Sequence, residues 1–468
     1  MDYVSTRGQD GPLGYEEALL SGLARDGGLY LPTDYPAFTE DEIRAMAGLP
    51  YARLAGRIMA RFTDGEIGEA ELAAMAGDAY AEFTDSEVAP LRRLTDQIHV
   101  MELFHGPTIA FKDYAMQFLS RAFDRALQAK GRQAVILGAT SGDTGSAALE
   151  AFRGRAAVDI FILFPEGRVS PVQQRQMTSV IAPGAHAVAV AGDFDDCQAI
   201  VKELFNDHGF RDDVNLSAVN SINWARLMPQ IVYYFKAALA LGAPDRKVAF
   251  SVPTGNFGNV FAGYVAMRMG LPVERFIVAS NRNDILTRFF EQGAMQRETV
   301  TPSLSPSMDI QVSSNFERLL FELLDRDGSA VAGIMARFAE TGRFDLPERA
   351  MAAARQHFSA YRLDDEGTIA EIAASASAGM VLDPHSAVGV SAARRALDDG
   401  TIPSDVPVVA LACAHPAKFQ DAVTRATGTE PPLPAHLADL MERPESMRHA
   451  PATAAAVREL VLSSRRAA

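Results

Sequence analysis

The stretch QAVILGATSGDTGS, residues 133–146, decides the fold class of this chain. An apolar run of strand length, 133–137, leads into a turn of small residues, which opens a stretch of helical length. A buried strand that passes through a Gly-containing turn into a helix is typical of parallel βαβ units. The stretch therefore predicts an α/β protein with open, mostly parallel sheets flanked by helices.

The same alternation continues on both sides of this stretch. Helical-length segments at 114–130, 171–181, 197–208 and 224–241 separate most of the apolar runs. A long helical region is expected from 315 to 398. The further strands are predicted at 158–164, 187–190, 214–219, 248–252, 276–279 and 407–413.

The length of 468 residues is too great for one compact core and suggests several domains. We predict a mainly helical N-terminal domain at 1–92 and an α/β core at 93–430, made of two lobes with a helical insertion at about 300–380. A Pro-rich and then helical tail is expected at 431–468.

The composition excludes several classes of function. A net charge of −15 argues against nucleic acid or an anionic membrane as the main partner. Two cysteines make no disulfide framework, and the histidines show no metal-ligand spacing. No apolar run reaches the roughly 18 residues of a membrane span, and the first residues lack a signal-peptide pattern. A cytoplasmic protein is expected.

Lysine is rare in this chain. Only six of the 44 basic residues are lysines, so arginine supplies nearly every generic positive charge. A lysine amine, unlike a guanidinium, can lose its proton near neutral pH and attack a carbonyl. Lys112 and Lys418 are the two whose surroundings have no ordinary explanation as helix-surface or strand-end charges.

Lys112 lies in FHGPTIAFKD, residues 104–113, just before a predicted helix. Partial burial among its apolar neighbours would lower the pKa of the amine and make it a usable nucleophile and base. The structural alternative is an extended lysine that pairs with Asp113 at the start of the helix.

Two strand–turn–helix junctions are candidate anion sites. In 137–146 and again in 252–259 (VPTGNFGN), a turn of small residues presents backbone N–H groups at the start of a helix. The first turn lacks the lysine of a Walker A loop, and the second is not GxGxxG. The structural alternative in both cases is a tight turn with a capping side chain.

Two further segments contain candidate site residues, Cys413 in one and His385 in the other. Cys413, in ACAHPAKF (412–419), follows the last predicted strand, and a small buried hydrophobe is the alternative to a site residue there. His385 lies in DPHSAVG (383–389), and a structural hydrogen-bonding role is favoured for it over the role of a base.

Taken in order, FHGPTIAFKD, ATSGDTG, VPTGNFGN, DPHSAVG and HPAKF resemble the threonine synthases of the long bacterial and fungal type. YVSTRG (3–8) and EALLSGLARDGGLYLP (17–32) resemble the N-terminal domain of that family. The resemblance implies the tryptophan synthase β-subunit fold, pyridoxal phosphate as cofactor, and conversion of O-phospho-L-homoserine and water into L-threonine and phosphate. It also implies a monomer.

The resemblance also implies roles for individual residues. Lys112 matches the lysine that forms the Schiff base, and Cys413 stands where the family usually has Thr beside the pyridine nitrogen. Asp143 matches a residue facing the ring hydroxyl. The cofactor-phosphate loop matches Gly255, Asn256, Phe257, Gly258 and Asn259. The substrate-binding residues match Thr140, Ser141, Gly142 and Thr144, with Ser221, Asn223 and Arg226 for the substrate phosphate.

Two other readings remain open at this point. Another lyase of the same fold, such as a threonine dehydratase or a cysteine synthase, would need no second phosphate site. A non-catalytic phosphate-ligand or nucleotide-binding protein would not need Lys112.

Overall fold

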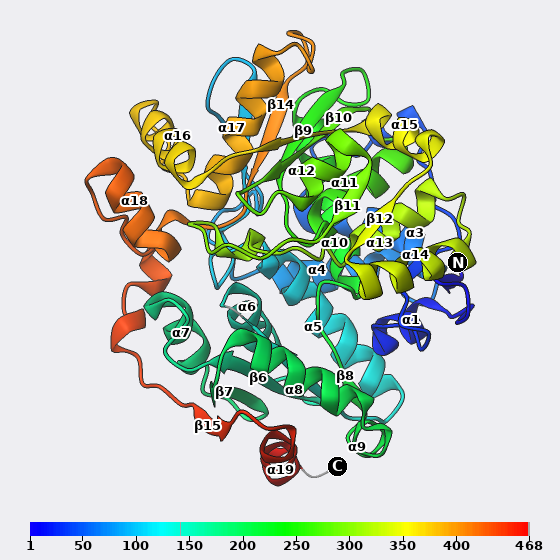
Figure 1. The fold of residues 1–468 in the computed structure, drawn as a ribbon, viewed down its shortest axis with the longest axis vertical. Helices are drawn as coiled ribbons and strands as arrows, with labels where there is room; N and C mark the ends of the chain where they lie inside the picture. The colour runs from blue at the N-terminus through cyan, green and yellow to red at the C-terminus, as the bar shows by residue number, and fades with distance from the viewer. Residues whose placement is uncertain (141, 467–468) are drawn as a thin grey trace.

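The computed structural model describes residues 1–140 and 142–466. Its two larger sheets, one mostly and one wholly parallel, lie in two lobes (Figure 1). The lower lobe in this view carries the sheet built on residues 134–217, and the upper lobe carries the sheet built around β9 (Val248–Pro253) and β10 (Val273–Ser280). The predicted α/β class is confirmed.

The larger sheet has the strand order β13-β10-β9-β14-β4-β3, and only the β3/β4 pair is antiparallel. Its central strand β14 comes from late in the chain and pairs with β9 and β4. The remaining bounds are β3 Leu91–Arg93, β4 Ile98–Glu102, β13 Phe358–Arg362 and β14 Val408–Ala412.

The smaller sheet is parallel throughout and has the order β15-β7-β6-β5-β8. All eight residues of β6 are buried, because helices cover both faces of a doubly wound sheet. The expected strand at 214–219 is shorter in the structure. The bounds are β5 Ala134–Ala139, β6 Val158–Pro165, β7 Ala185–Ala191, β8 Leu216–Ser217 and β15 Arg448–Pro451.

The helices of the core fall between these strands, as the alternation predicts. The helix α10 is apolar on nearly all sides, and it packs against α5 and α11 in the largest hydrophobic cluster. The bounds are α5 Lys112–Ala129, α6 Asp143–Phe152, α7 Pro171–Thr178, α8 Phe194–Asn206, α9 His208–Asp213, α10 Trp224–Ala240 and α11 Gly258–Arg268.

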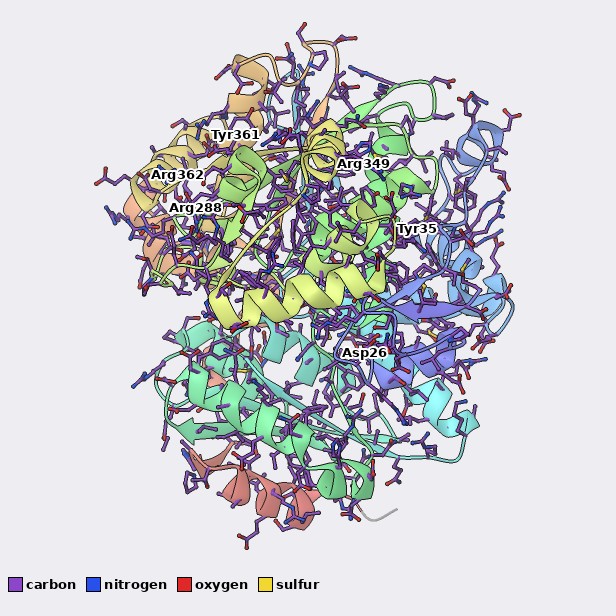
Figure 2. The ribbon with its side chains drawn as sticks, turned by 45° about the vertical axis from the view of Figure 1, so that its right-hand side comes forward. Asp26, Tyr35, Arg288, Arg349, Tyr361 and Arg362 are labelled. Atoms are coloured by element: carbon purple, nitrogen blue, oxygen red, sulfur yellow. The ribbon has the colours of Figure 1, made fainter. Side chains whose placement is uncertain are left out.

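The N-terminal region is mainly helical, with one short antiparallel strand pair. It is anchored to the upper lobe at Tyr35 (Figure 2), whose hydroxyl donates to Glu322 Oε1 at 3.2 Å and whose ring lies under Arg268 and Arg326. The bounds are β1 Tyr3–Ser5, α1 Tyr15–Ser21, β2 Tyr30–Pro32, α2 Glu40–Arg44, α3 Tyr51–Thr63 and α4 Glu69–Tyr80.

The region expected to be helical from 315 to 398 also contains strands. β13 extends the larger sheet beside β10, and ion pairs of Arg288 and Arg362 to the same Asp284, both at 2.8 Å, hold this edge (Figure 2). The bounds are α12 Ile285–Gln292, β11 Ala294–Gln296, α13 Phe316–Leu323, α14 Gly328–Thr341, β12 Arg343–Asp345, α15 Glu348–His357, α16 Asp365–Ser377 and α17 Pro384–Asp398.

The C-terminal segment returns from the upper lobe to the lower one (Figure 1). After the turn η2 (Pro416–Phe419) and α18 (Gln420–Thr427), it adds β15 to the open edge of β7, and α19 (Ala454–Ser464) packs on α8. The expected helix is present, but the tail also supplies a strand of the smaller sheet. Within residues 1–140 and 142–466, no helix combines the length and apolar character that a membrane crossing needs.

Candidate active site

A cavity of about 770 Å³ gathers most of the predicted site residues. Parallel strands place their carboxyl ends at one edge of a sheet, and the turns after β5, β9 and β14 all line this cavity. Lys112, Thr140, Asp143, Thr144, Ser221, Arg226, Gly255, Asn256, Phe257, Gly258, Asn259 and Cys413 are among its lining residues.

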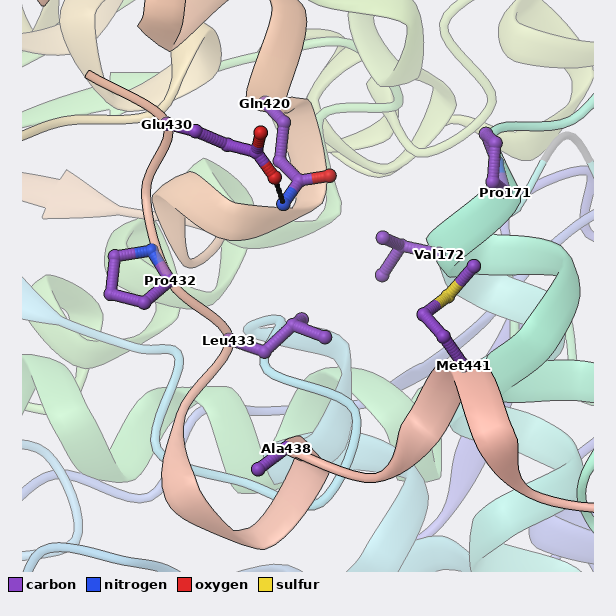
Figure 3. A pocket seen from close by; sticks show the side chains of 8 residues that line it. All are labelled: Pro171, Val172, Gln420, Glu430, Pro432, Leu433, Ala438 and Met441. Atoms are coloured by element: carbon purple, nitrogen blue, oxygen red, sulfur yellow. Dashed lines mark hydrogen bonds between the residues drawn. The ribbon is translucent and has the colours of Figure 1, made fainter.

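A second pocket, of about 500 Å³, lies between the start of α7 and the segment around Leu433 and Met441 (Figure 3). Its one polar contact among the side chains drawn is the bond from Gln420 Nε2 to Glu430 Oε1 at 2.8 Å. Its lining includes no lysine, histidine or cysteine, so the chemistry expected from the sequence belongs to the larger cavity.

Lys112 is the first residue of α5 and is nearly buried, with 11% of its side chain exposed. The preceding loop is tied to the end of β14, because Phe111 N donates to Cys413 O at 2.8 Å. Asp113 is engaged by the backbone N–H and hydroxyl of Thr108, so the alternative pairing of Lys112 with Asp113 is wrong. Burial lowers the pKa of Lys112, and the carboxylate of Asp143, 3.4 Å away, opposes this shift.

The loop of residues 254–257 joins β9 to α11. Phe257 adopts a left-handed conformation with φ 62°, and the carbonyls of Gly255 and Asn256 accept bonds from Ser313 Oγ and Asn315 N. No described residue accepts a bond from the backbone N–H groups of residues 255–259. These N–H groups at the start of a helix form a cradle for an anion.

The amide of Asn259 adds a side-chain donor to this cradle. Its Oδ1 accepts bonds from the hydroxyls of Tyr233 at 2.6 Å and Tyr234 at 3.0 Å. Its Nδ2 is buried and finds no acceptor within the described part of the chain. A buried donor without an acceptor costs free energy, so it points to a ligand that accepts the bond.

Gly255 is required at its position by a close approach of backbone. A Cβ atom there would lie 2.9 Å from Ser307 O and 3.2 Å from Met308 Cα. We expect Gly255→Val to displace the loop and to weaken binding of pyridoxal phosphate, the cofactor that the resemblance implies, at least about tenfold, or about 1.4 kcal/mol. A cofactor titration followed by absorbance measures this effect.

The control for this variant is Gly333→Val, on α14, where an added Cβ meets nothing within 4 Å. Both proteins should show native circular dichroism. An unchanged cofactor affinity in Gly255→Val would remove this loop from the cofactor site.

The loop after β5 is organised by Thr140, whose Oγ1 accepts bonds from Gly142 N and Gly145 N. This is the capped turn of the structural alternative, and Gly142 is not among the cavity-lining residues. Asp143 and Thr144 line the cavity at the start of α6. Ser141 lies outside the described residues.

The carboxylate of Asp143 contacts two ammonium groups and two neutral hydrogen-bond donors. Lys418 Nζ lies 2.8 Å from Oδ1, Lys112 Nζ lies 3.4 Å from Oδ2, and Gln173 and Ser307 donate at 2.9 and 3.2 Å. Burial alone would raise the pKa of Asp143, but the two ammonium groups hold it well below its usual range. Gln173 and Ser307 carry no signal in the sequence that would have identified them.

Cys413 follows β14, lines the cavity and is nearly buried. Burial raises the pKa of its thiol, so the side chain is neutral. Its backbone N–H donates to Ser386 Oγ at 3.0 Å, and the neighbouring His385 accepts a bond from Ser307 N while its Nδ1 lies 2.8 Å from Asp383. His385 makes these hydrogen bonds and also lines the cavity, so its structural role stays a prediction.

The segment 220–226 divides into structural and cavity-lining residues. Asn223 caps α10 through Ala225 N, and its Nδ2 donates to Leu19 O at 2.9 Å, so its side chain is committed to the fold. Ser221 and Arg226 line the cavity. Arg226 donates to Val219 O at 3.0 Å and has no carboxylate partner among the described residues, while its Nε is buried without an acceptor. Burial lowers the pKa of Arg226 to about 10.

These features fit pyridoxal phosphate as a ligand of the larger cavity. A nearly buried amine suits the aldehyde, the cradle at 255–259 suits the phosphate, and the neutral thiol of Cys413 can donate weakly to the pyridine nitrogen. The donors of Arg226 remain for a second anion.

Three family descriptions match the chain. "Threonine synthase N terminus" matches residues 2–80, "Pyridoxal-phosphate dependent enzyme" matches residues 83–341, and "Threonine synthase, C-terminal" matches residues 386–461. The second match alone covers more than half of the chain. These ranges do not test the boundaries expected at 92 and 430, which stay a prediction.

Similar proteins of known name agree with these matches. The threonine synthase of Pseudomonas aeruginosa is 53% identical to this chain over 95% of the chain and 94% of its own length. The structure of a threonine synthase from Brucella melitensis with pyridoxal phosphate bound has a TM-score of 0.97 and 55% identity, with full coverage of both chains. The yeast threonine synthase structure has a TM-score of 0.94 and 37% identity, covering 99% and 98%.

Proposed function

This chain belongs to the threonine synthase family of pyridoxal-phosphate-dependent enzymes, and on that premise we propose that it converts O-phospho-L-homoserine and water into L-threonine and phosphate. The observation that carries the proposed substrate is the presence of two separate anion-binding features on one cavity. The N–H cradle at 255–259 serves the cofactor phosphate, and the buried guanidinium of Arg226 serves the phosphate of the substrate.

The presence of two anion sites distinguishes a threonine synthase from the other lyases of this fold. A threonine dehydratase or a cysteine synthase has no substrate phosphate to hold while the reaction proceeds. In a chain of net charge −15, a buried arginine without a carboxylate partner costs free energy, and an anionic substrate offsets that cost.

Pyridoxal phosphate supplies an electron sink at the substrate Cα when it is bound. Lys112 would hold the aldehyde of the cofactor, and its amine would be free once the amino group of the substrate takes that place. The free amine would take the Cα proton and pass it on before it takes the Cβ proton. Phosphate would then leave from Cγ, which receives a proton in its place, water would add its hydroxyl at Cβ, and Cα would regain its proton. The lowered pKa of Lys112 suits this alternation between acid and base.

The remaining residues position the substrate. We assign Ser221 and Arg226 to the substrate phosphate, and Thr140 and Thr144, which both line the cavity, to its carboxylate. Asn223 supports the site indirectly, as the cap of the helix that carries Arg226.

The direct test incubates the purified protein with O-phosphohomoserine and follows inorganic phosphate and threonine together. We expect the two products in equal amounts. Phosphate released without threonine would contradict the proposed reaction, and the absence of a visible cofactor absorbance band would favour a non-catalytic binding protein.

Cys413 provides a prediction about product choice. A neutral partner at the pyridine nitrogen tempers the electron sink, whereas a carboxylate would favour a protonated ring. We expect Cys413→Thr to stay within a few-fold of the parent rate, and Cys413→Asp to raise the ratio of 2-oxobutyrate to threonine. Both products can be measured in one chromatographic assay.

Cys197→Thr is the matched control, because Cys197 is also a buried free thiol but is not among the residues that line the cavity. If Cys413→Asp kept the parent rate and product ratio, Cys413 would be a packing residue only.

The monomeric state and the cytoplasmic location expected from the sequence are also part of this proposal. Both cysteines are buried free thiols, and unpaired cysteines are usual in a reducing compartment. Light scattering after size exclusion tests the oligomeric state.

A further inference from the structure

Lys418 is the second lysine that the sequence singles out, and its position in the structure gives it a role. Its side chain is 0% exposed, and its ammonium lies 2.8 Å from Asp143 Oδ1 and donates to Thr108 O at 3.0 Å. Lys418 is not among the residues that line the cavity. It therefore reaches the site through Asp143 rather than through a ligand.

Asp143 is shared between this buried lysine and Lys112. The carboxylate faces two ammonium groups, one on each oxygen, while Gln173 and Ser307 contribute neutral donors. The charged and titratable groups that face Lys112 are Asp143, Lys418, Arg226 and Cys413. Lys418 also faces the carboxyl group of Asp113, whose pKa burial raises to about 6. With both lysines protonated, the cluster of two lysines and one carboxylate has one positive charge in excess.

This excess positive charge determines the charge balance of the cluster after Lys112 loses its proton. With Lys418 in place, loss of the proton from Lys112 leaves a balanced pair of Lys418 and Asp143. Without Lys418, the same loss would leave Asp143 as a buried carboxylate with neutral donors only. Burial of an unpaired charge is strongly unfavourable, so Lys112 would hold its proton more tightly.

We propose that Lys418 is the permanent counter-ion of Asp143, which allows Lys112 to give up its charge without leaving a buried carboxylate unpaired. This inference deepens the proposed function, in which Lys112 must be neutral to bind an aldehyde and to accept a proton. Lys418 is thus a positioning residue that acts on Lys112 through Asp143.

The test measures the reactivity of Lys112 directly in the full-length protein freed of pyridoxal phosphate. Of the two protonation states of an amine, fluorodinitrobenzene labels only the neutral one, and peptide mass mapping across a pH series gives the labelling profile of Lys112. In Lys418→Met we expect the profile to move to higher pH and the labelling rate near neutral pH to fall about tenfold, since one pKa unit changes the neutral fraction tenfold. Lys202, exposed on α8, is the internal control and should keep its profile.

Two further variants separate charge from packing. Lys418→Arg keeps a cation beside Asp143 and should restore part of the reactivity. Lys418→Met combined with Asp143→Asn removes the carboxylate that would be left unpaired, so the profile of Lys112 should return to that of the parent protein or to lower pH. A structural role of Lys418 alone gives no such recovery.

An unmoved profile in Lys418→Met, or no recovery in the double variant, would overturn the proposal. If the single variant does not fold, folding of the double variant with a parental profile supports the proposal, and failure of both to fold overturns it. The labelling requires neither substrate nor turnover. Failure of the proposed function, such as attachment of the cofactor at another lysine, is therefore distinguishable from failure of this inference.

Discussion

Lys112→Ala and Lys112→Arg should both have no detectable turnover of O-phosphohomoserine. Alanine has no amine, and arginine keeps a positive charge but cannot link to the cofactor aldehyde or accept a proton near neutral pH. Because Lys112 is the only lysine that lines the cavity, no described neighbour can take its place there. Phosphate release and threonine formation measure the loss.

The site of attachment is tested separately from the rate. Reduction of the cofactor-loaded protein with borohydride, followed by peptide mass mapping, should place the pyridoxyl group on Lys112. Lys236→Arg, on α10 and paired with Glu87, is the matched control and should keep the parent rate. Recovery of the pyridoxyl group on Lys418 or Lys247 would exclude Lys112 as the catalytic lysine.

Arg226→Ala should lower kcat/KM for O-phosphohomoserine at least tenfold while cofactor affinity stays unchanged. A guanidinium can bind two phosphate oxygens at once, and loss of a buried charged partner costs about 2–5 kcal/mol. A loss of about 1.4 kcal/mol already corresponds to a factor of ten. Steady-state kinetics and a cofactor titration measure the two quantities.

The discriminating comparison uses serine, which has no phosphate, titrated by its effect on the cofactor spectrum. Arg275→Ala is the matched control, because Arg275 also donates to a backbone carbonyl, also has a buried Nε without an acceptor, and does not line the cavity. If Arg226→Ala weakens the binding of serine and of O-phosphohomoserine equally, or weakens the binding of neither, Arg226 does not belong to the substrate-phosphate site.

The parts of this molecule that the sequence predicted well are those with strong local patterns. β5 and β9 are apolar runs that end in turns of small residues, and their turns both reach the cavity. β13 and β15 were missed because their residues, FSAYR and RHAP, carry little apolar pattern. These segments become strands through backbone pairing with β10 and β7.

The same distinction holds within the site. Lys112 could be singled out from its apolar neighbours and from the scarcity of lysine in the chain. The partners of Asp143 could not, because Gln173, Ser307 and Lys418 come from distant elements and meet only in the folded chain. Asn223 had the residue type of a ligand, but the structure commits it to a helix cap.

The late position of β14 and β15 in the chain has a consequence for the order of assembly during synthesis. A growing chain that has not reached Val408 lacks the strand that joins β9 to β4, so the larger sheet is still in two pieces. The edge of β7 stays open until residues 448–451 have emerged. Open sheet edges in incomplete chains are sites of aberrant pairing, so both sheets of this protein stay exposed to it until these last segments have been synthesised.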